Sequence, residues 1–349
     1  MLNRILGFFF TVCLACQPLR AEIVHDLYAA TVPVKDQGES ARASASREAL
    51  AQVLVKVSGN AAVLENPDIK EGLRDARGKV QQYAYRQDES SDSGLAVRFE
   101  FDGGLVKDLV TSAGEPLWTA NRPPVLVWLA IDDDDGATLV SRDTAAQQTE
   151  ALLAAFGRRG VPVRLPLLDL QDTAALSAAD IQALDRGKLR EASARYAVEH
   201  IVAARINVLS SGEHVGEWSY LFDDEHLNRP VRGADFDAHL RAGVDAVAMA
   251  MASYYAVASI DGEGAGITMS VAGVESYADY AAVLAWLESL EMVDKAKLER
   301  VNGARLDLRL DSRAEPAQIP AIIELNPRLR PAEFPRPGVQ LDYVWRAGE

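Results

Sequence analysis

Two turn-rich joints constrain the fold of this chain more than any other feature of its sequence. The first is Asn121-Arg122-Pro123-Pro124, and the second is Asp261-Gly262-Glu263-Gly264-Ala265-Gly266. The second stretch has no helical or strand period, which is typical of a flexible link. The joints therefore predict three domains, at residues 22–120, 121–260 and 261–349, behind an amino-terminal leader at residues 1–21.

The leader has the pattern of a cleaved secretory signal. Arg4 precedes an apolar run from Ile5 to Cys16, and Gln17 ends that run. The run is shorter than the about 20 apolar residues that a membrane-spanning helix needs. A buried core helix is the alternative, but such helices rarely lack a polar face. We expect export, cleavage between Ala21 and Glu22, and no transmembrane segment after signal removal.

Both cysteines of the chain, Cys13 and Cys16, lie inside the leader. Leu14 and Ala15 before Cys16 are similar to a lipoprotein processing box, but Cys13 stands where that box has leucine. We therefore expect no lipid anchor at Cys16. The mature chain would then have no thiol for disulfides, redox chemistry or thiolate metal ligands.

The chain is acidic, with 36 Lys and Arg against 51 Asp and Glu and a formal net charge of −15. Loss of Arg4 and Arg20 with the leader removes two positive charges, which takes the net charge from −15 to −17. Nucleic-acid binding depends on clustered Lys and Arg, and the chain has no such run. The charge therefore excludes nucleic acid as a partner and disfavours anionic lipid surfaces.

The first segment predicts a β-α-β-β-α unit. Its strands are expected at Leu27–Val34, Val80–Arg86 and Leu95–Phe101, and its helices at Ser40–Val57 and about Gly104–Ser112. Gly59 or Asn60 is expected to close the first helix, because either residue can adopt the left-handed conformation of a helix C-cap.

The middle segment predicts an α/β sheet with helices on both faces. Val125–Ile131 is a continuous apolar run, which is typical of a strand covered on both faces. Helices are expected at Thr144–Arg158, Ser177–Tyr196 with a break near Gly187, and Phe236–Val257, and further strands at Val161–Leu165, His200–Leu209, Val215–Phe222 and near Val231.

The last segment predicts a ferredoxin-like split βαβ unit. Strands are expected at Ile267–Ala272, Val293–Val301, Ala304–Leu310 and Val339–Trp345, and helices at Ser276–Leu290 and Pro316–Leu325. Asn302-Gly303 between two of these strands is a strong hairpin signal.

Four motifs together carry a family resemblance: LYAATVPVKDQGESAR, ALAQVLVKVSGN, NRPPVLVWLA and SVAGVESYADYAAVLAWLESL. With them the chain, from Leu27 to Trp345, resembles the uncharacterised bacterial family domain of unknown function 2066. This resemblance implies an exported Gram-negative protein and supplies no catalytic residues. The middle segment is more loosely similar to the amino-terminal α/β domains of periplasmic envelope factors such as TolB and the penicillin-binding-protein activator lipoproteins, a likeness of fold alone.

The acidic run Asp132, Asp133, Asp134 and Asp135 before Gly136 is the strongest candidate for a cation site. It lacks the alternating ligands of an EF-hand, and Asp143 stands where that loop has its bidentate glutamate. We expect a solvated turn after a buried strand. A ligand site stays the alternative, because α/β folds place ligands at the carboxyl ends of their strands.

Other candidate chemistry is weaker. Neither His200 with His214 nor the run from Asp223 to His226 has zinc spacing. There is no G-x-S-x-G elbow, and the glycines at 262–266 precede a strand instead of opening a helix. We expect no cofactor, no metal and no catalytic residues.

Trp118 and Arg122 beside the first joint are the candidates for contact with a partner. Packing between the first two domains is the alternative for both side chains.

These observations favour a periplasmic, non-enzymatic interaction or adaptor protein of the bacterial cell envelope. The alternatives are an envelope hydrolase with its site near Asp132–Asp135 and a sensor that binds a small ligand between domains.

Overall fold

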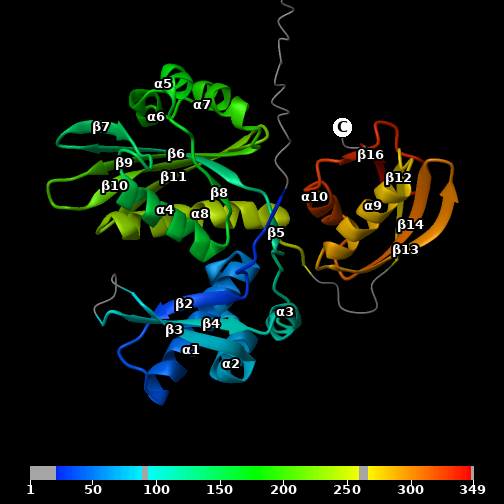
Figure 1. The fold of residues 1–349 in the computed structure, drawn as a ribbon, viewed down its shortest axis with the longest axis horizontal. Coiled ribbons are helices and arrows are strands. Elements are labelled where there is room, and N and C mark those ends of the chain that lie inside the picture. Colours follow the sequence, from blue (N-terminus) through cyan, green and yellow to red (C-terminus); the bar gives the residue numbers. More distant parts are fainter. Residues whose placement is uncertain (1–20, 89–92, 259–265, 347–349) are drawn as a thin grey trace, which may run out of the picture.

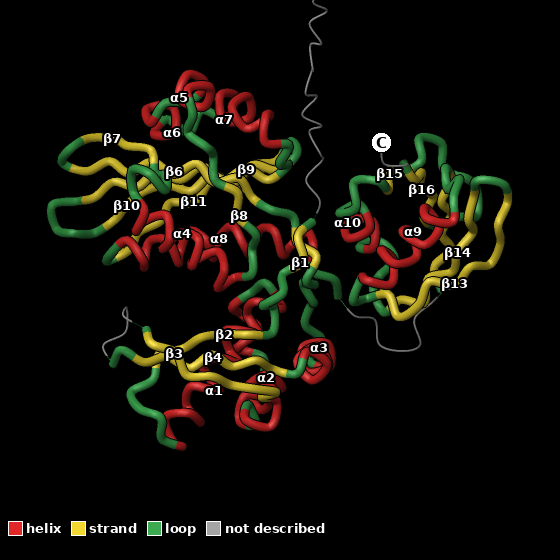
Figure 2. The backbone as a smooth tube through the Cα atoms, in the orientation of Figure 1, coloured by secondary structure: helices red, strands yellow, loops and turns green. Residues whose placement is uncertain are grey.

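The computed structural model describes residues 21–88, 93–258 and 266–346. Three sheets follow one another along the chain, with three, six and five strands (Figure 1 and Figure 2). A short antiparallel pairing also joins β1 (Glu22–Ile23) to β5 (Asn121–Arg122). The predicted mixed α and β fold with several sheets is confirmed. Among the described helices, none combines the length and hydrophobicity of a membrane span.

The amino-terminal sheet has the order β2-β4-β3, and both pairings are antiparallel. Its strands are β2 (Ala29–Pro33), β3 (Val80–Gln87) and β4 (Leu95–Phe101), and its helices are α1 (Glu39–Ser58), α2 (Pro67–Arg74) and α3 (Gly103–Ser112). Short 3₁₀ turns lie at Ala61–Glu65 and Arg77–Lys79. α1 packs on β2 and β4 through a buried stripe that includes Leu50 and Leu54. The predicted β-α-β-β-α order is present.

Two local signals shape this unit. Gly59 closes α1 in the left-handed conformation, with φ 75°, as the prediction of a C-cap requires. α2 was not predicted. Asn66 caps it and Pro67 occupies its first turn, a start signal that the search for a hydrophobic period does not detect.

The middle sheet has the order β11-β10-β9-β6-β7, and β8 also pairs with β6. The strands are β6 (Val125–Asp133), β7 (Gly136–Leu139), β8 (Val163–Arg164), β9 (His200–Val208), β10 (His214–Phe222) and β11 (Glu225–Gly233). β6 and β9 run parallel, whereas β10 and β11 extend the sheet antiparallel. β6 is buried on both faces, as its continuous apolar run predicts.

Helices cover both faces of the middle sheet, as expected (Figure 1). They are α4 (Ala146–Arg159) and α8 (Phe236–Tyr255) on one face, and α5 (Leu170–Ala175), α6 (Ala178–Gln182) and α7 (Arg186–Ser193) on the other. A 3₁₀ turn follows at Ala194–Tyr196. The helical segment predicted at Ser177–Tyr196 is broken, as expected, but the break lies between Gln182 and Arg186, and Gly187 is inside α7. Ser177 and Asp185 cap separate helices there, and a left-handed φ of 50° at Leu184 separates them.

The carboxy-terminal sheet has the order β13-β14-β12-β16-β15. Its strands are β12 (Ile267–Ala272), β13 (Val293–Asn302), β14 (Arg305–Ser312), β15 (Leu329–Pro331) and β16 (Leu341–Trp345), and its helices are α9 (Tyr277–Ser289) and α10 (Ile319–Ile323). The predicted hairpin joins β13 to β14 at Asn302, with Gly303 at φ 60°.

This unit departs from the ferredoxin-like topology in one respect. The last strand of that fold would pair antiparallel with the first, whereas β16 pairs parallel with β12. The short β15 makes the difference, because it follows α10 and lets the chain turn back before β16 enters the sheet. β15 contains only three residues and ends at Pro331, so its sequence carries almost no strand signal.

Candidate functional site

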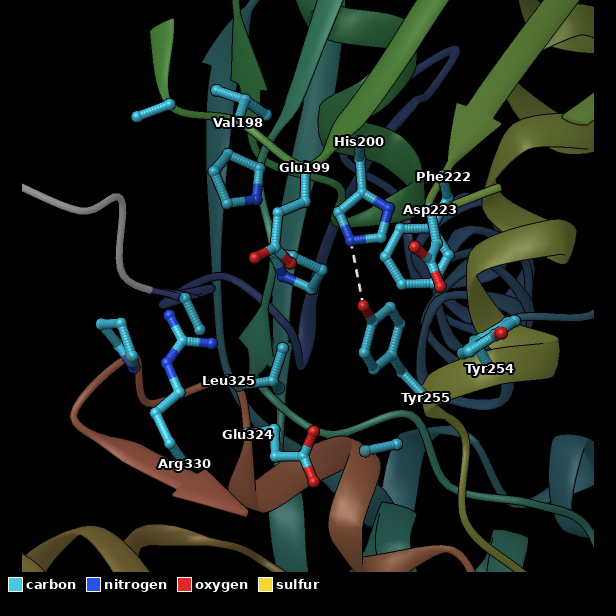
Figure 3. Close-up of a pocket in the computed structure, with 16 residues that line it drawn as sticks. Val198, Glu199, His200, Phe222, Asp223, Tyr254, Tyr255, Glu324, Leu325 and Arg330 are labelled. Atoms are coloured by element: carbon cyan, nitrogen blue, oxygen red, sulfur yellow. Dashed lines mark hydrogen bonds between the residues drawn. The ribbon is translucent and has the colours of Figure 1, made fainter. Parts of the chain in front are cut away.

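A pocket of about 340 Å³ lies between the middle sheet and the carboxy-terminal unit (Figure 3). Its middle-domain wall is formed by the residues before β6, the start of β9, the end of β10 and the last turn of α8. Its opposite wall is the segment from α10 to β15. The two walls meet because α10 packs against α8, and Ala321 and Leu325 lie on the middle core.

His200 forms the buried floor of the pocket and is held between two tyrosines. Its Nδ1 lies 2.7 Å from the Tyr220 hydroxyl oxygen, and its Nε2 lies 2.9 Å from the Tyr255 hydroxyl oxygen. The Phe222 ring stacks on the imidazole, with centroids 4.2 Å apart. A neutral imidazole donates from one nitrogen and accepts at the other, so one hydroxyl accepts a hydrogen bond and the other donates one.

Burial keeps this floor uncharged. It lowers the pKa of His200 to about 3, because the charged imidazolium would lose its hydration. Burial also raises the pKa values of Tyr220 and Tyr255. His200 is therefore neutral near pH 7 and has no free nitrogen, which makes it a poor general acid or base.

Charged side chains stand around the floor (Figure 3). Glu199 precedes β9, Asp223 lies in the turn between β10 and β11, and Glu324 follows α10. The Tyr343 hydroxyl donates to Glu324 at 2.9 Å. Within the described residues, no Lys or Arg forms an ion pair with any of these three carboxylates. Arg330 is the one arginine or lysine among the described residues that line the pocket.

A second hollow of about 400 Å³ adjoins the pocket, along α8 and β11. Phe222 and Tyr254 line both hollows, and their rings meet edge to face with centroids 4.9 Å apart. Met249, with 43% of its surface exposed, and Leu227 line the second hollow. We call the two hollows together the α8 groove. Glu199, Asp223 and Glu324 line the first hollow, and Glu225, His226 and Arg229 line the second beside its apolar side chains.

The acidic run predicted as a candidate site lies at the opposite end of β6. Asp133 pairs with Gly136 in the β6–β7 hairpin, and the Asp133 carboxylate accepts a hydrogen bond from the Asp135 backbone N–H at 3.0 Å. Asp132 is partly exposed, and Asp133, Asp134 and Asp135 are exposed. Across residues 21–88, 93–258 and 266–346, no group of three or more His, Cys, Asp or Glu side chains could hold a metal ion.

Trp118 and Arg122 are both fully buried, so neither side chain lies on a described surface. The Arg122 guanidinium stacks on the Trp118 ring, 3.8 Å from the centroid. It donates hydrogen bonds to five backbone carbonyls, those of Lys56, Trp118, Thr119, Arg159 and Gly160. Trp118 and Arg122 therefore pack between the first two domains, which was the alternative to partner contact in the sequence analysis.

The five carbonyls explain why an arginine is needed at this joint. Lys56 lies in the last turn of α1, and Arg159 and Gly160 end α4. The last carbonyls of a helix lack partners within the helix and carry the negative end of its dipole. Arg122 therefore caps two helices from different domains at once, and Arg159 adds a hydrogen bond to the Gly59 carbonyl.

The histidines paired in the sequence do not meet. His214 lies at the far end of β10 and pairs with Val208, and His226 contacts Arg186. Glu324, Arg330 and Tyr254 were not singled out from the sequence, because they join the pocket only through packing between domains. The acidic turn at Asp223 was the available signal.

The predicted processing site lies beside the pocket. Ala21 lines the pocket wall, and Glu22 pairs with Arg122 in the β1–β5 ladder and forms an ion pair with Arg164. The leader up to residue 20, including Cys13 and Cys16, and the second joint at residues 261–265 lie outside the described residues.

Comparison with known proteins identifies an uncharacterised domain in part of the chain. A family model described as Domain of unknown function (DUF8605) matches residues 21–119. It is not the domain of unknown function 2066 that the motifs suggested. No curated protein matches the chain. One solved structure, described as "Crystal structure of uncharacterized protein", is 12% identical, with a TM-score of 0.19, over 38% of this chain and 90% of the other.

Proposed function

We propose that this chain is an exported, non-enzymatic interaction protein of the bacterial cell envelope, and that its α8 groove binds a basic segment of a partner protein. The observation that carries this proposal is the set of three carboxylates, from separate elements, around an uncharged aromatic floor. The wider resemblance to domain of unknown function 2066 and the periplasmic location belong to the same proposal.

The chemistry of the pocket favours a cationic group. Carboxylates without cationic partners accept strong charge-assisted hydrogen bonds from a guanidinium or ammonium group. The exposed ring of Tyr254 offers a face for the same cation. The acidic net charge of −15 would also attract a basic partner over a longer range.

The shape of the groove favours a protein segment over a free small molecule. The pocket alone is near the lower limit for small-molecule sites, about 300 Å³. The adjoining hollow on the other side of Phe222 and Tyr254 adds surface for the residues next to a bound side chain along a peptide. Apolar anchors such as Met249 and Leu227 suit the residues beside the basic one.

In-cell crosslinking tests the proposal. A photoreactive residue in place of Met249 should capture one principal protein through a basic segment. The double variant Asp223→Asn/Glu324→Gln should reduce capture at least about tenfold, because each lost carboxylate removes a charge-assisted hydrogen bond. The matched control is Asp134→Asn/Asp135→Asn, which removes the same charge at the far end of β6 and should leave capture unchanged.

Two outcomes would count against this function. Equal capture by both double variants would show that the pocket carboxylates do not select the partner. Hydrolysis of envelope material by the purified protein, lost in Asp134→Asn/Asp135→Asn, would instead support the hydrolase alternative.

A further inference from the structure

The free edge of the amino-terminal sheet is a second surface, remote in sequence from the α8 groove. β3 forms this edge, and β4 is its one neighbour among the described strands (Figure 2). Six of its eight residues are exposed, including Tyr83 at 47%, and Val80 and Tyr85 are half-buried. An edge strand of eight residues is long enough to template another strand.

The register shows which backbone groups of β3 face outward. The backbone N–H of Asp88 donates to the Gly94 carbonyl at 3.1 Å, which marks a hydrogen-bonded pair just beyond the strand. Hydrogen-bonded and non-hydrogen-bonded pairs alternate along an antiparallel ladder. Tyr83 opposite Phe99 and Tyr85 opposite Val97 are then non-hydrogen-bonded pairs. Their N–H and carbonyl groups therefore point away from β4.

A groove runs beside this edge, where α1 leaves the sheet uncovered. α1 packs mainly on β2 and β4. The groove, of about 450 Å³, is lined by Arg42 and Ser46 of α1, Arg77, and Tyr83 and Phe99 of the sheet. An added strand beside β3 would place alternate side chains over this groove.

The other edges of the three sheets in the described chain are protected. β13 carries lysines and two register shifts, β11 contains Pro230, and β15 ends at Pro331. β2 ends at Pro33, β7 has only four residues, and β8 has only two. Prolines, charges, bulges and short length are the usual means of preventing strand addition. β3 has one bulge at its start and a single charged residue, Arg86.

The positive charges beside β3 indicate which kind of strand could pair with this edge. The guanidinium carbon of Arg42 lies over the Tyr83 ring, 5.2 Å from its centroid. Neither Arg42 nor Arg86 forms an ion pair with a described residue. Arg77 adds a third guanidinium, which contacts Glu39. A second copy of this chain would bring the same arginines toward one another. We propose that β3 receives an extended, acidic peptide segment of a partner protein as a fourth strand.

The probe is a random peptide library displayed on phage, selected against the purified protein. We expect acid-rich extended peptides, and a synthetic copy of the best one should bind with an affinity measurable by fluorescence anisotropy. Tyr85→Pro, which removes an outward N–H, should weaken binding by more than about tenfold, whereas Tyr85→Thr, which keeps that N–H, should weaken it less than about threefold. Circular dichroism checks that both variants are folded.

Two further measurements do not depend on proline being tolerated. N-methylation of the alternate peptide residues whose N–H groups face β3 should abolish binding. N-methylation of the other alternate residues, whose N–H groups face away, should leave binding unchanged. Arg42→Glu should weaken the acidic peptide about tenfold, whereas Arg47→Glu, the same charge change at an exposed α1 position outside the groove, should not.

The proposal is overturned if the library yields no binder, if binders lack acidic residues, or if N-methylation has the same effect on both peptide edges. Light scattering supplies one more decisive result. A doubled mass that Tyr85→Pro returns to the monomer would assign β3 to a second copy of the chain.

Discussion

At the scale of single residues, buried polar groups fix the geometry of the two most informative places. His200 and Arg122 are both fully buried, yet every polar atom of the His200 ring and all three nitrogens of the Arg122 guanidinium have hydrogen-bond partners. Burial lowers the pKa of Arg122 to about 9, with a contribution from Arg159, so this guanidinium still carries its charge at pH 7. Satisfied polar groups of this kind select one arrangement of neighbouring elements.

The buried imidazole predicts a specific acid sensitivity. His200 has a pKa of about 3 when folded and an ordinary value of 6.5 when unfolded, so below pH 6.5 the unfolded state binds an extra proton. The free energy of unfolding therefore falls as pH decreases from 6.5 toward 3, by up to about 1.4 kcal/mol per pH unit from this residue. In His200→Gln this contribution is lost, and denaturant titrations at several pH values should show a shallower decline. A decline as steep as in the wild type would contradict the assignment.

At the scale of elements, hydrophobic period and turn chemistry predict much of the fold. The prediction for β4 matches the structure at both ends, and that for α1 differs by one residue at each end, because β4 alternates on a half-covered sheet and α1 ends at a glycine. Short elements escape this reasoning. β15 has three residues and α5 has six, so neither is long enough to show two full repeats of a strand or helix pattern. Packing therefore decides their structure.

The end of α1 offers a test of close packing. A Cβ on Gly59 would lie 2.1 Å from the Cβ of Ala252 in α8, in a backbone with φ 75°. Gly59→Ala should therefore lower the free energy of unfolding by about 3 kcal/mol or more, from left-handed strain and overpacking together. Gly114 has φ 70° with open space around it, so Gly114→Ala should cost only about 1 kcal/mol. Equal losses in urea unfolding would show that the contact between α1 and α8 tolerates the extra methyl group.

At the scale of the whole molecule, the candidate site arises from contacts that no local pattern encodes. Glu199, Tyr254 and Glu324 come from distant parts of the chain and meet because α10 packs on α8. The Tyr28 hydroxyl also donates to Glu291 at 3.0 Å, which ties the first unit to the third. The sequence identified the acidic turn at Asp223 but could not show which side chains it would face. It placed its alternative ligand site at the carboxyl end of β6, whereas the pocket lies at the other end.

The proposed route of export predicts the chemistry of the mature amino terminus, which stands beside this pocket. Cleavage after Ala21 would remove one residue of the pocket wall and leave the α-amino group of Glu22 at its rim. Intact-mass analysis of protein from the periplasmic fraction should give a chain that begins at Glu22 and does not react with thiol reagents, because both cysteines are lost. Cys16→Ser should leave this mass unchanged, since Cys16 takes no part in cleavage at Ala21. A lipid-modified chain that begins at Cys16, and that disappears in Cys16→Ser, would instead establish a membrane anchor and would place the α8 groove at the membrane surface.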